Sequence, residues 1–172
     1  MPADHDGDAE RHPTPTADDL TGAQVGSIAF SSVLRLLADN ATTLVPTTVQ
    51  RRRGTAGRTR ATVEMRRILN ELMDRAITAD LGEGATWPEL AAALGVDPEI
   101  AVLRYAHLDW QHLDDDAHAT WAQYHRSCPE QLHDFCPSDP AVAARQLDTW
   151  YEHHADPRDP APAPTRAVTA GL

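Results

Sequence analysis

The chain has 172 residues, enough for one folded core with a small helical satellite and too few for two large domains. Its formal net charge is −11, and its 15 Lys and Arg residues are all Arg, which excludes a phosphate loop or a Schiff base built on a lysine amine. The sequence has no GxSxG or HExxH motif, no apolar run long enough to span a bilayer and no signal-peptide pattern. We therefore expect a non-enzymatic, cytoplasmic protein.

Acidic and basic residues are unevenly distributed along the chain. Residues 1–50 contain seven acidic and two basic side chains, residues 51–108 eight and nine, and residues 109–172 eleven and four. Only the middle third is thus suited to face a phosphate backbone without strong repulsion.

The N-terminal third is predicted to contain one helix. Residues 1–20 are acidic and poor in apolar side chains, which predicts a disordered tail. Residues 21–40 are predicted to form an amphipathic helix, because apolar residues recur there at helical spacing. These are Val25, Ile28, Ala29, Val33, Leu36 and Leu37.

Residues 41–59 lose this periodicity and are interpreted as a basic linker. The segment includes Arg51, Arg52, Arg53 and Arg58 and has no interleaved aromatic residue. A solvated hinge is one interpretation, since such charge runs are usually just exposed. The other is an arginine arm that contacts nucleic-acid phosphates or a minor groove.

The clearest periodicity predicts a helix over residues 60–81, ended by Gly82 and Gly84. Its apolar stripe consists of Met65, Ile68, Leu69, Leu72, Met73, Ala76, Ile77 and Leu81. The opposite side is predicted to be a solvated face and carries Arg66, Arg67, Glu71, Asp74 and Asp80.

Two short helices are predicted next, joined by a tight turn. Thr86 and Glu89 have the spacing of a capping box at the start of the first helix, and Pro88 falls in its first turn. Gly95 suits the left-handed turn that follows. Asp97 and Pro98 then open a second helix that ends near Leu108. Residues 60–108 therefore match a helix-turn-helix unit with three helices.

The segment 84–105, Gly-Ala-Thr-Trp-Pro-Glu-Leu-Ala-Ala-Ala-Leu-Gly-Val followed by Arg104-Tyr105, resembles the helix-turn-helix common in small actinobacterial regulators. The resemblance implies a DNA-binding transcriptional regulator. A homodimer on double-stranded DNA is expected, because one short helix reads few bases. Under this hypothesis one set of residues faces DNA and a second set neutralises the charge of the phosphates. The first set is Arg104, His107 and Thr86, and the second is Arg51, Arg52, Arg53, Arg58 and Arg60.

The second short helix departs from that pattern at its start. Asp97, Pro98 and Glu99 stand where small polar or basic residues are usual, and two carboxylates there would be repelled by phosphate. The alternative hypothesis is an acidic module that uses the same scaffold to bind another regulator or the transcription machinery.

Residues 109–154 are predicted to form a helical extension, with one helix that starts at Asp114, Asp115 and Asp116 and another opened by Asp139-Pro140. Both are expected to pack over the helix-turn-helix unit, because the aromatic residues concentrate here. Residues 155–172 are predicted to form a disordered Pro-rich tail. The overall prediction is an all-α fold with disordered termini.

A near-repeat of His-x-x-Cys-Pro lies between the two C-terminal helices. It places His125, Cys128, His133 and Cys136 within twelve residues, a ligand set that suits a structural zinc ion. The alternative is that Cys128 and Cys136 are buried thiols at helix ends marked by the prolines that follow them. No other cofactor is expected.

Overall fold

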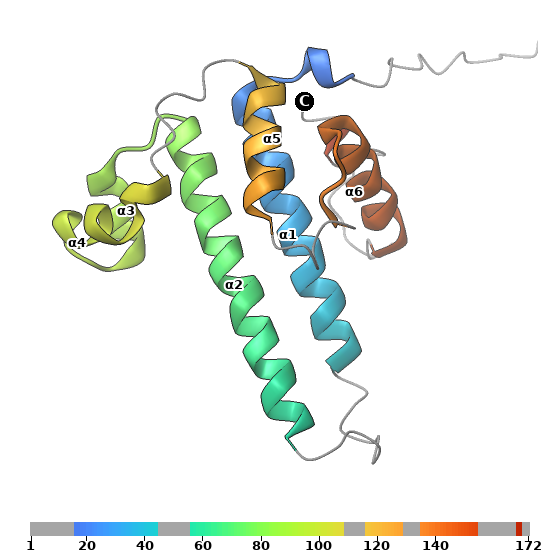
Figure 1. The fold of residues 1–172 in the computed structure, drawn as a ribbon, viewed down its shortest axis with the longest axis horizontal. Coiled ribbons are helices and arrows are strands. Elements are labelled where there is room, and N and C mark those ends of the chain that lie inside the picture. The colour runs from blue at the N-terminus through green and yellow to red at the C-terminus, as the bar shows by residue number, and fades with distance from the viewer. Residues whose placement is uncertain (1–15, 45–55, 109–115, 129–134, 155–167, 170–172) are drawn as a thin grey trace, which may run out of the picture.

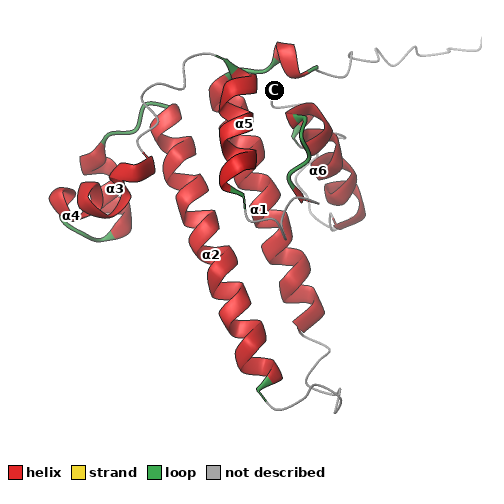
Figure 2. Cartoon of the chain, viewed as in Figure 1, coloured by secondary structure: helices red, strands yellow, loops and turns green. Residues whose placement is uncertain are grey.

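The computed structural model describes residues 16–44, 56–108, 116–128, 135–154 and 168–169. Within these ranges the chain forms six α-helices and two short 3-10 helices, and it contains no strand (Figure 2). The fold class is all-α, as the sequence predicts. None of the described helices is both long and apolar enough to cross a membrane.

Two long helices, α1 (Gly22–Leu44) and α2 (Gly57–Gly82), run side by side through the fold (Figure 1). A reciprocal cap starts α1: the Thr21 N–H donates to Gln24 Oε1 at 2.7 Å, and the Gln24 N–H donates to Thr21 Oγ1 at 3.3 Å. Both helices are longer than predicted. The extra turns at the end of α1 and the start of α2 lack apolar periodicity, so the sequence pattern missed them.

Gly26 lies where α1, α2 and a third helix, α5 (Ala117–Ser127), approach closely. A Cβ atom at this position would lie 3.3 Å from Tyr124 Oη and 3.4 Å from Ala79 Cα. The absence of a side chain at Gly26 therefore permits the close packing of α1 on α2.

The apolar stripe predicted on α2 is wider than its buried face. Ile68 and Ile77 are buried, whereas Leu69 and Met73 are exposed. A charged residue, Arg75, occupies the buried side instead and is only 4% exposed. The prediction of one continuous inward stripe is wrong at these positions, because α2 contacts its neighbours through a narrower face than its sequence offers.

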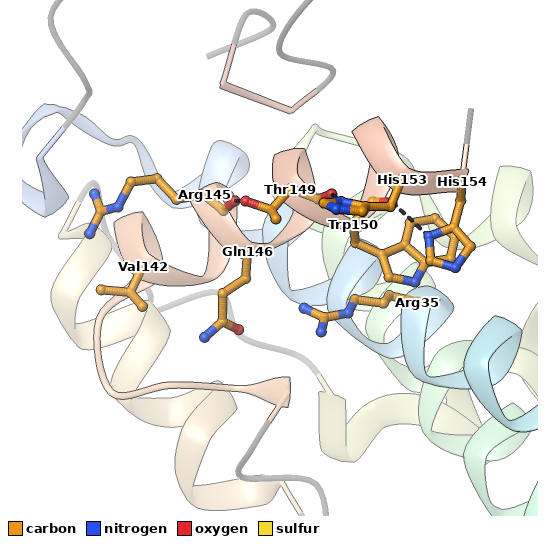
Figure 3. Close-up of a pocket in the computed structure, with 8 residues that line it drawn as sticks. All are labelled: Arg35, Val142, Arg145, Gln146, Thr149, Trp150, His153 and His154. Atoms are coloured by element: carbon orange, nitrogen blue, oxygen red, sulfur yellow. Dashed lines mark hydrogen bonds between the residues drawn. The ribbon is translucent and has the colours of Figure 1, made fainter. Parts of the chain in front are cut away.

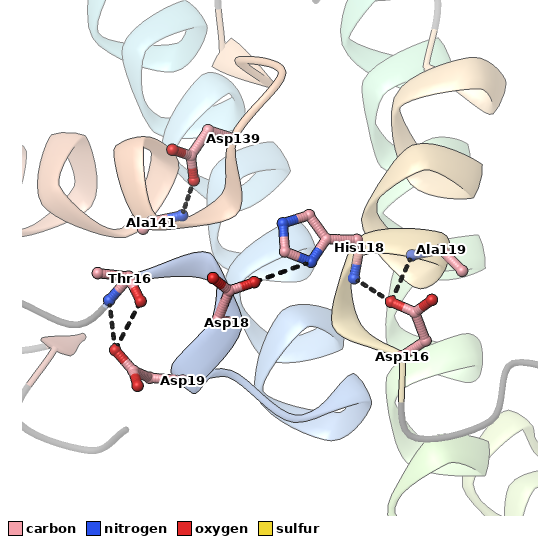
Figure 4. A network of polar contacts seen from close by, with 8 residues as sticks. All are labelled: Thr16, Asp18, Asp19, Asp116, His118, Ala119, Asp139 and Ala141. Carbon is pink, nitrogen blue, oxygen red and sulfur yellow. Dashed lines mark hydrogen bonds and ion pairs between the residues drawn. The ribbon is translucent and has the colours of Figure 1, made fainter.

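Helices α5 (Ala117–Ser127) and α6 (Pro140–His154) each begin at an aspartate, as predicted (Figure 4). Asp116 Oδ1 accepts hydrogen bonds from the N–H groups of His118 and Ala119, and Asp139 Oδ1 accepts one from Ala141. These carboxylates satisfy backbone donors that a helix start leaves unpaired.

Both C-terminal helices pack on α1, and not over the short helices that follow α2 (Figure 1). The expectation that they pack over the helix-turn-helix unit is therefore wrong for its two short helices, although α5 contacts α2, where Arg75 donates to Tyr124 O. The main core forms between α1, α2, α5 and α6 because the stripe on α1 meets Trp121 and Tyr124. Its buried members are Leu20, Val25, Ile28, Ala29, Val33, Leu36, Ile68, Ala117, Trp121, Tyr124, Cys128, Cys136, Ala143, Ala144 and Leu147.

Parts of both predicted tails are folded against this core. The 3-10 helix η1 (Ala17–Asp19) is followed by the buried Leu20, and Asp18 lies 3.8 Å from His118 of α5 (Figure 4). Near the other end, Val168 packs on the core. The prediction of disorder is wrong for these short segments. Each contributes one apolar side chain to the core, which the overall composition of the tails does not reveal.

Candidate interaction surface on α4

Helix α3 (Trp87–Leu94) begins at the predicted pair of Thr86 and Glu89. The backbone N–H and the hydroxyl of Thr86 donate to Glu89 Oε2 at 2.8 and 2.7 Å. The hydroxyl and then the backbone N–H stabilise the carboxylate and hold the pKa of Glu89 below its usual value. The start of α3 is thus fixed by local hydrogen bonds.

The turn after α3 follows from a glycine in the left-handed region. Gly95 has a φ of +68°, and the Val96 N–H donates to Ala91 O at 3.0 Å. Asp97 then precedes helix α4 (Pro98–Tyr105), and its carbonyl accepts from the N–H groups of Ile100 and Ala101. The 3-10 helix η3 (Ala106–Leu108) continues directly from α4.

A second, smaller apolar cluster holds these elements together. Ile77 of α2, Leu90 of α3 and Leu108 of η3 are its buried members. Leu81, Ala85, Trp87, Leu94 and Tyr105 are partly buried against them. Ala91 and Ala101 are also buried, as expected where two helices cross closely. The two short helices therefore rest on the C-terminal part of α2.

The outward side of α4 is apolar and acidic. Leu103 is 86% exposed, Ile100 is 46% exposed and Val102 is 38% exposed. Leu103 follows the buried Ala101 by two positions, which rotates it about 200° to the opposite side of the helix. Asp97 and Glu99 are exposed at the N-terminal end of the same helix. The sequence does not single out Leu103, because four apolar residues follow one another from Ile100 to Leu103 and no periodicity separates the covered side from the outward side.

The residues predicted to contact DNA are only partly brought together. Arg104 and His107 are exposed at the C-terminal end of the α4–η3 segment, and Thr86 is exposed at the start of α3. Arg58 and Arg60 are exposed in the first turn of α2, roughly 33 Å or more along the helix axis from its C-terminal end. Arg51, Arg52 and Arg53 lie outside the described residues.

His107 takes part in an electrostatic interaction with α2. Burial raises the pKa of Asp74, the nearby Glu71 acts in the same direction, and His107 acts against both. His107, which was predicted to face DNA, is therefore close enough to the partly buried carboxyl group of Asp74 to interact with it electrostatically.

A buried arginine links α2 to α5. Arg75 Nε donates to Glu71 Oε1 at 2.8 Å, and Arg75 Nη2 donates to Tyr124 O at 3.1 Å. Its guanidinium also lies 4.6 Å from the centre of the Tyr124 ring. Burial raises the pKa of Tyr124 to about 12, against the effect of Arg75. Sequence periodicity placed no charged residue inside the fold and so missed this contact.

Of the predicted zinc ligands, the structure brings Cys128 and Cys136 together. Both are buried in the main core, and their thiols form a hydrogen bond. His125 is half-buried in the last turn of α5, and His133 lies outside the described residues. Among the described residues no group of three or more His, Cys, Asp or Glu side chains is arranged to hold a metal ion. The zinc site stays a prediction.

A shallow groove between α1 and α6 carries several basic side chains (Figure 3). Arg35 lies 3.7 Å from Asp39, the Trp150 Nε1–H donates to Asp39 Oδ1 at 2.8 Å, and the ring of His154 stacks on Trp150 with centroids 4.3 Å apart. Nδ1 of His153 is 2.6 Å from Thr149 O. Of these contacts, the hydrogen bond from Trp150 to Asp39 joins α6 to α1, and the others lie within one helix.

Comparison with known proteins adds no relative. No protein-family model matches the chain, and neither a curated protein nor a solved structure matches it. The site must therefore be interpreted from its own residues.

Proposed function

We propose that α3 and α4, with the C-terminal part of α2, form a helix-turn-helix unit that binds a protein partner through α4. The observation that carries the proposal is the exposed apolar side of α4, formed by Ile100, Val102 and Leu103. The chain then acts as a non-enzymatic interaction protein. The partner is another regulator or a component of the transcription machinery.

The exposed side chains of α4 indicate what kind of partner surface would fit it. Burying a leucine side chain contributes about 1.5–3 kcal/mol, so Leu103 is suited to an apolar pocket. Asp97 and Glu99 at the same end favour a basic rim around that pocket. A second copy of this chain fits less well, because each carries a net charge of −11.

A DNA-binding regulator is the second candidate function. It is favoured by the exposure of α4, Arg104 and His107. Against it, Glu99 and Leu103 lie one turn apart on the outward side of α4, where a groove would meet them. A carboxylate there repels phosphate, and a leucine offers no hydrogen bond to a base edge apart from apolar contact with a thymine methyl group.

The test begins by identifying proteins that cross-link to α4 in cells, followed by affinity measurements with the purified partner. Leu103→Asp is expected to weaken binding at least about tenfold, or about 1.4 kcal/mol. Leu69→Asp is the matched control, because Leu69 is an exposed leucine in the middle of α2. Equal loss in both variants, or no loss at Leu103, contradicts the proposal.

The DNA alternative is measured in parallel with genomic fragments over a range of salt concentrations. A regulator that neutralises several phosphates loses affinity steeply as salt rises, and Arg104→Ala weakens its binding. We expect no such binding at low salt. Salt-dependent binding that Arg104→Ala reduces and Leu103→Asp leaves intact would replace the first proposal with the second.

A further inference from the structure

Two cysteines meet in the main core, away from α4. Cys128 directly follows α5, and Cys136 lies eight positions later, shortly before α6. They are 6% and 7% exposed, and no disulfide joins them in the structure. Both belong to the same buried cluster, in which the Cys136 side chain is a hydrogen-bond partner of Cys128.

Both thiols line one small, mostly enclosed cavity of about 10 Å³, room for about one water molecule, between α1, α2 and the segment before α6. Arg75, Ser32 and Phe135 line the same cavity. Arg75 brings a buried positive charge to the sulfur atoms, a feature that stabilises a thiolate. A divalent cation at the same place would face that guanidinium, so the described groups suit thiol chemistry better than zinc.

The two thiols differ in acidity. The hydrogen bond from Cys136 lowers the pKa of Cys128, and Arg75 and Arg67 act in the same direction against burial. That hydrogen bond, burial and the negative charge of Cys128 raise the pKa of Cys136. Cys128 is therefore the better nucleophile of the pair, and Cys136 is its proton donor.

We propose that Cys128 and Cys136 form a reversible dithiol–disulfide pair that a small hydroperoxide oxidises. The inference does not depend on the proposed function of α4. It assigns a modification site to the two buried cysteines that lie just after α5 and shortly before α6.

The reaction proceeds in two balanced steps. The Cys128 thiolate attacks one peroxide oxygen, the O–O bond breaks, and the leaving alkoxide takes the proton that Cys128 had released, which gives an alcohol and a sulfenic acid. The Cys136 sulfur then attacks Cys128 Sγ, the S–O bond breaks, and the leaving hydroxide takes the Cys136 proton to form water. Two electrons pass from the two sulfurs to the peroxide, and a dithiol reductant returns them.

The test treats the fully reduced chain with hydrogen peroxide, then alkylates remaining thiols and measures the intact mass. We expect the number of alkylated thiols to fall from two per chain to none, with the loss of two hydrogens and no added oxygen. Dithiothreitol should restore both thiols. Peptide mapping should show Cys128 joined to Cys136 within one chain.

Three variants make the result specific. Cys128→Ser and Cys136→Ser should each abolish the intramolecular product, whereas Ser32→Ala, in the same cavity, should form it like the wild type. Addition of oxygen without coupling, or two thiols that stay alkylatable in the folded chain, overturns the proposal. A stoichiometric zinc ion that the chain retains on purification and both cysteine variants lose also overturns it, because the thiolates would then be metal ligands.

Discussion

Asp148 shows how one buried side chain fixes a distant part of the chain. It lies on α6 and is largely buried, and its Oδ1 accepts hydrogen bonds from the N–H groups of Val168 and Thr169 at 2.8 and 3.2 Å. Its Oδ2 accepts one from the Thr169 hydroxyl at 2.7 Å. A single carboxyl group thus secures a segment twenty residues further along the sequence.

Replacing this carboxyl group should destabilise the whole fold. Asp148→Ala removes three hydrogen bonds and is expected to lower the free energy of unfolding by about 1–3 kcal/mol, measured by denaturant titration. Thr149→Ala is the neighbouring control, since its exposed hydroxyl bonds only to Arg145 O within the same helix. If Asp148→Ala is no less stable than Thr149→Ala, the segment at 168–169 contributes nothing to stability.

At the scale of elements, the start of α3 should respond to pH. Glu89 has a lowered pKa in the folded chain, so its ionised form favours folding. This contribution is present above the unfolded pKa of about 4.3 and is lost as pH falls through the lower folded pKa. We expect the protection of the α3 amides, measured relative to their intrinsic exchange rate at each pH, to fall over that acidic range.

The variant Glu89→Ala should remove this response. At neutral pH its α3 amides should exchange faster than those of the wild type, and the difference should shrink in acid as the wild-type carboxylate is protonated. Glu83→Ala, at an exposed position just after α2, is the control. An equal difference at neutral and acidic pH would show that the Thr86–Glu89 pair does not control the helix start.

Elements were the level at which sequence was most informative. Thr86 with Glu89, Gly95, and Asp139 before Pro140 act through local backbone chemistry, so their helix ends were predictable. The burial of Arg75 and the exposure of Leu103 could not be predicted. Which side of a helix is covered depends on neighbouring helices that periodicity does not identify. The sequence brought Cys128 and Cys136 together only as candidate zinc ligands, while their position beside Arg75 of α2 required the fold.

On the scale of the whole molecule, α2 belongs to two separate apolar clusters. Its middle contributes Ile68 to the main core, and its C-terminal part contributes Ile77 to the small cluster with Leu90 and Leu108. α3 and α4 contact each other closely, and their link to the main core is through α2 and η3 (Figure 1). The small unit should therefore open at lower free energy than the core.

Two core truncations should separate these units. Leu90→Ala is expected to cost about 2–4 kcal/mol within the small cluster and to remove hydrogen-exchange protection from α3 and α4 while α1 and α5 stay protected. Ile28→Ala, in the main core, should reduce protection in all helices. Simultaneous loss everywhere in Leu90→Ala would show instead that the chain unfolds as one cooperative unit.

Because α4 rests on few buried side chains, its outward surface can change by substitution during evolution. Substitutions at its outward positions disturb no packing in the four-helix core, so this surface is free to change its chemistry while the scaffold stays constant. Asp97 and Glu99 are exposed at the leading edge of α4, so the charge there can change without repacking the interior.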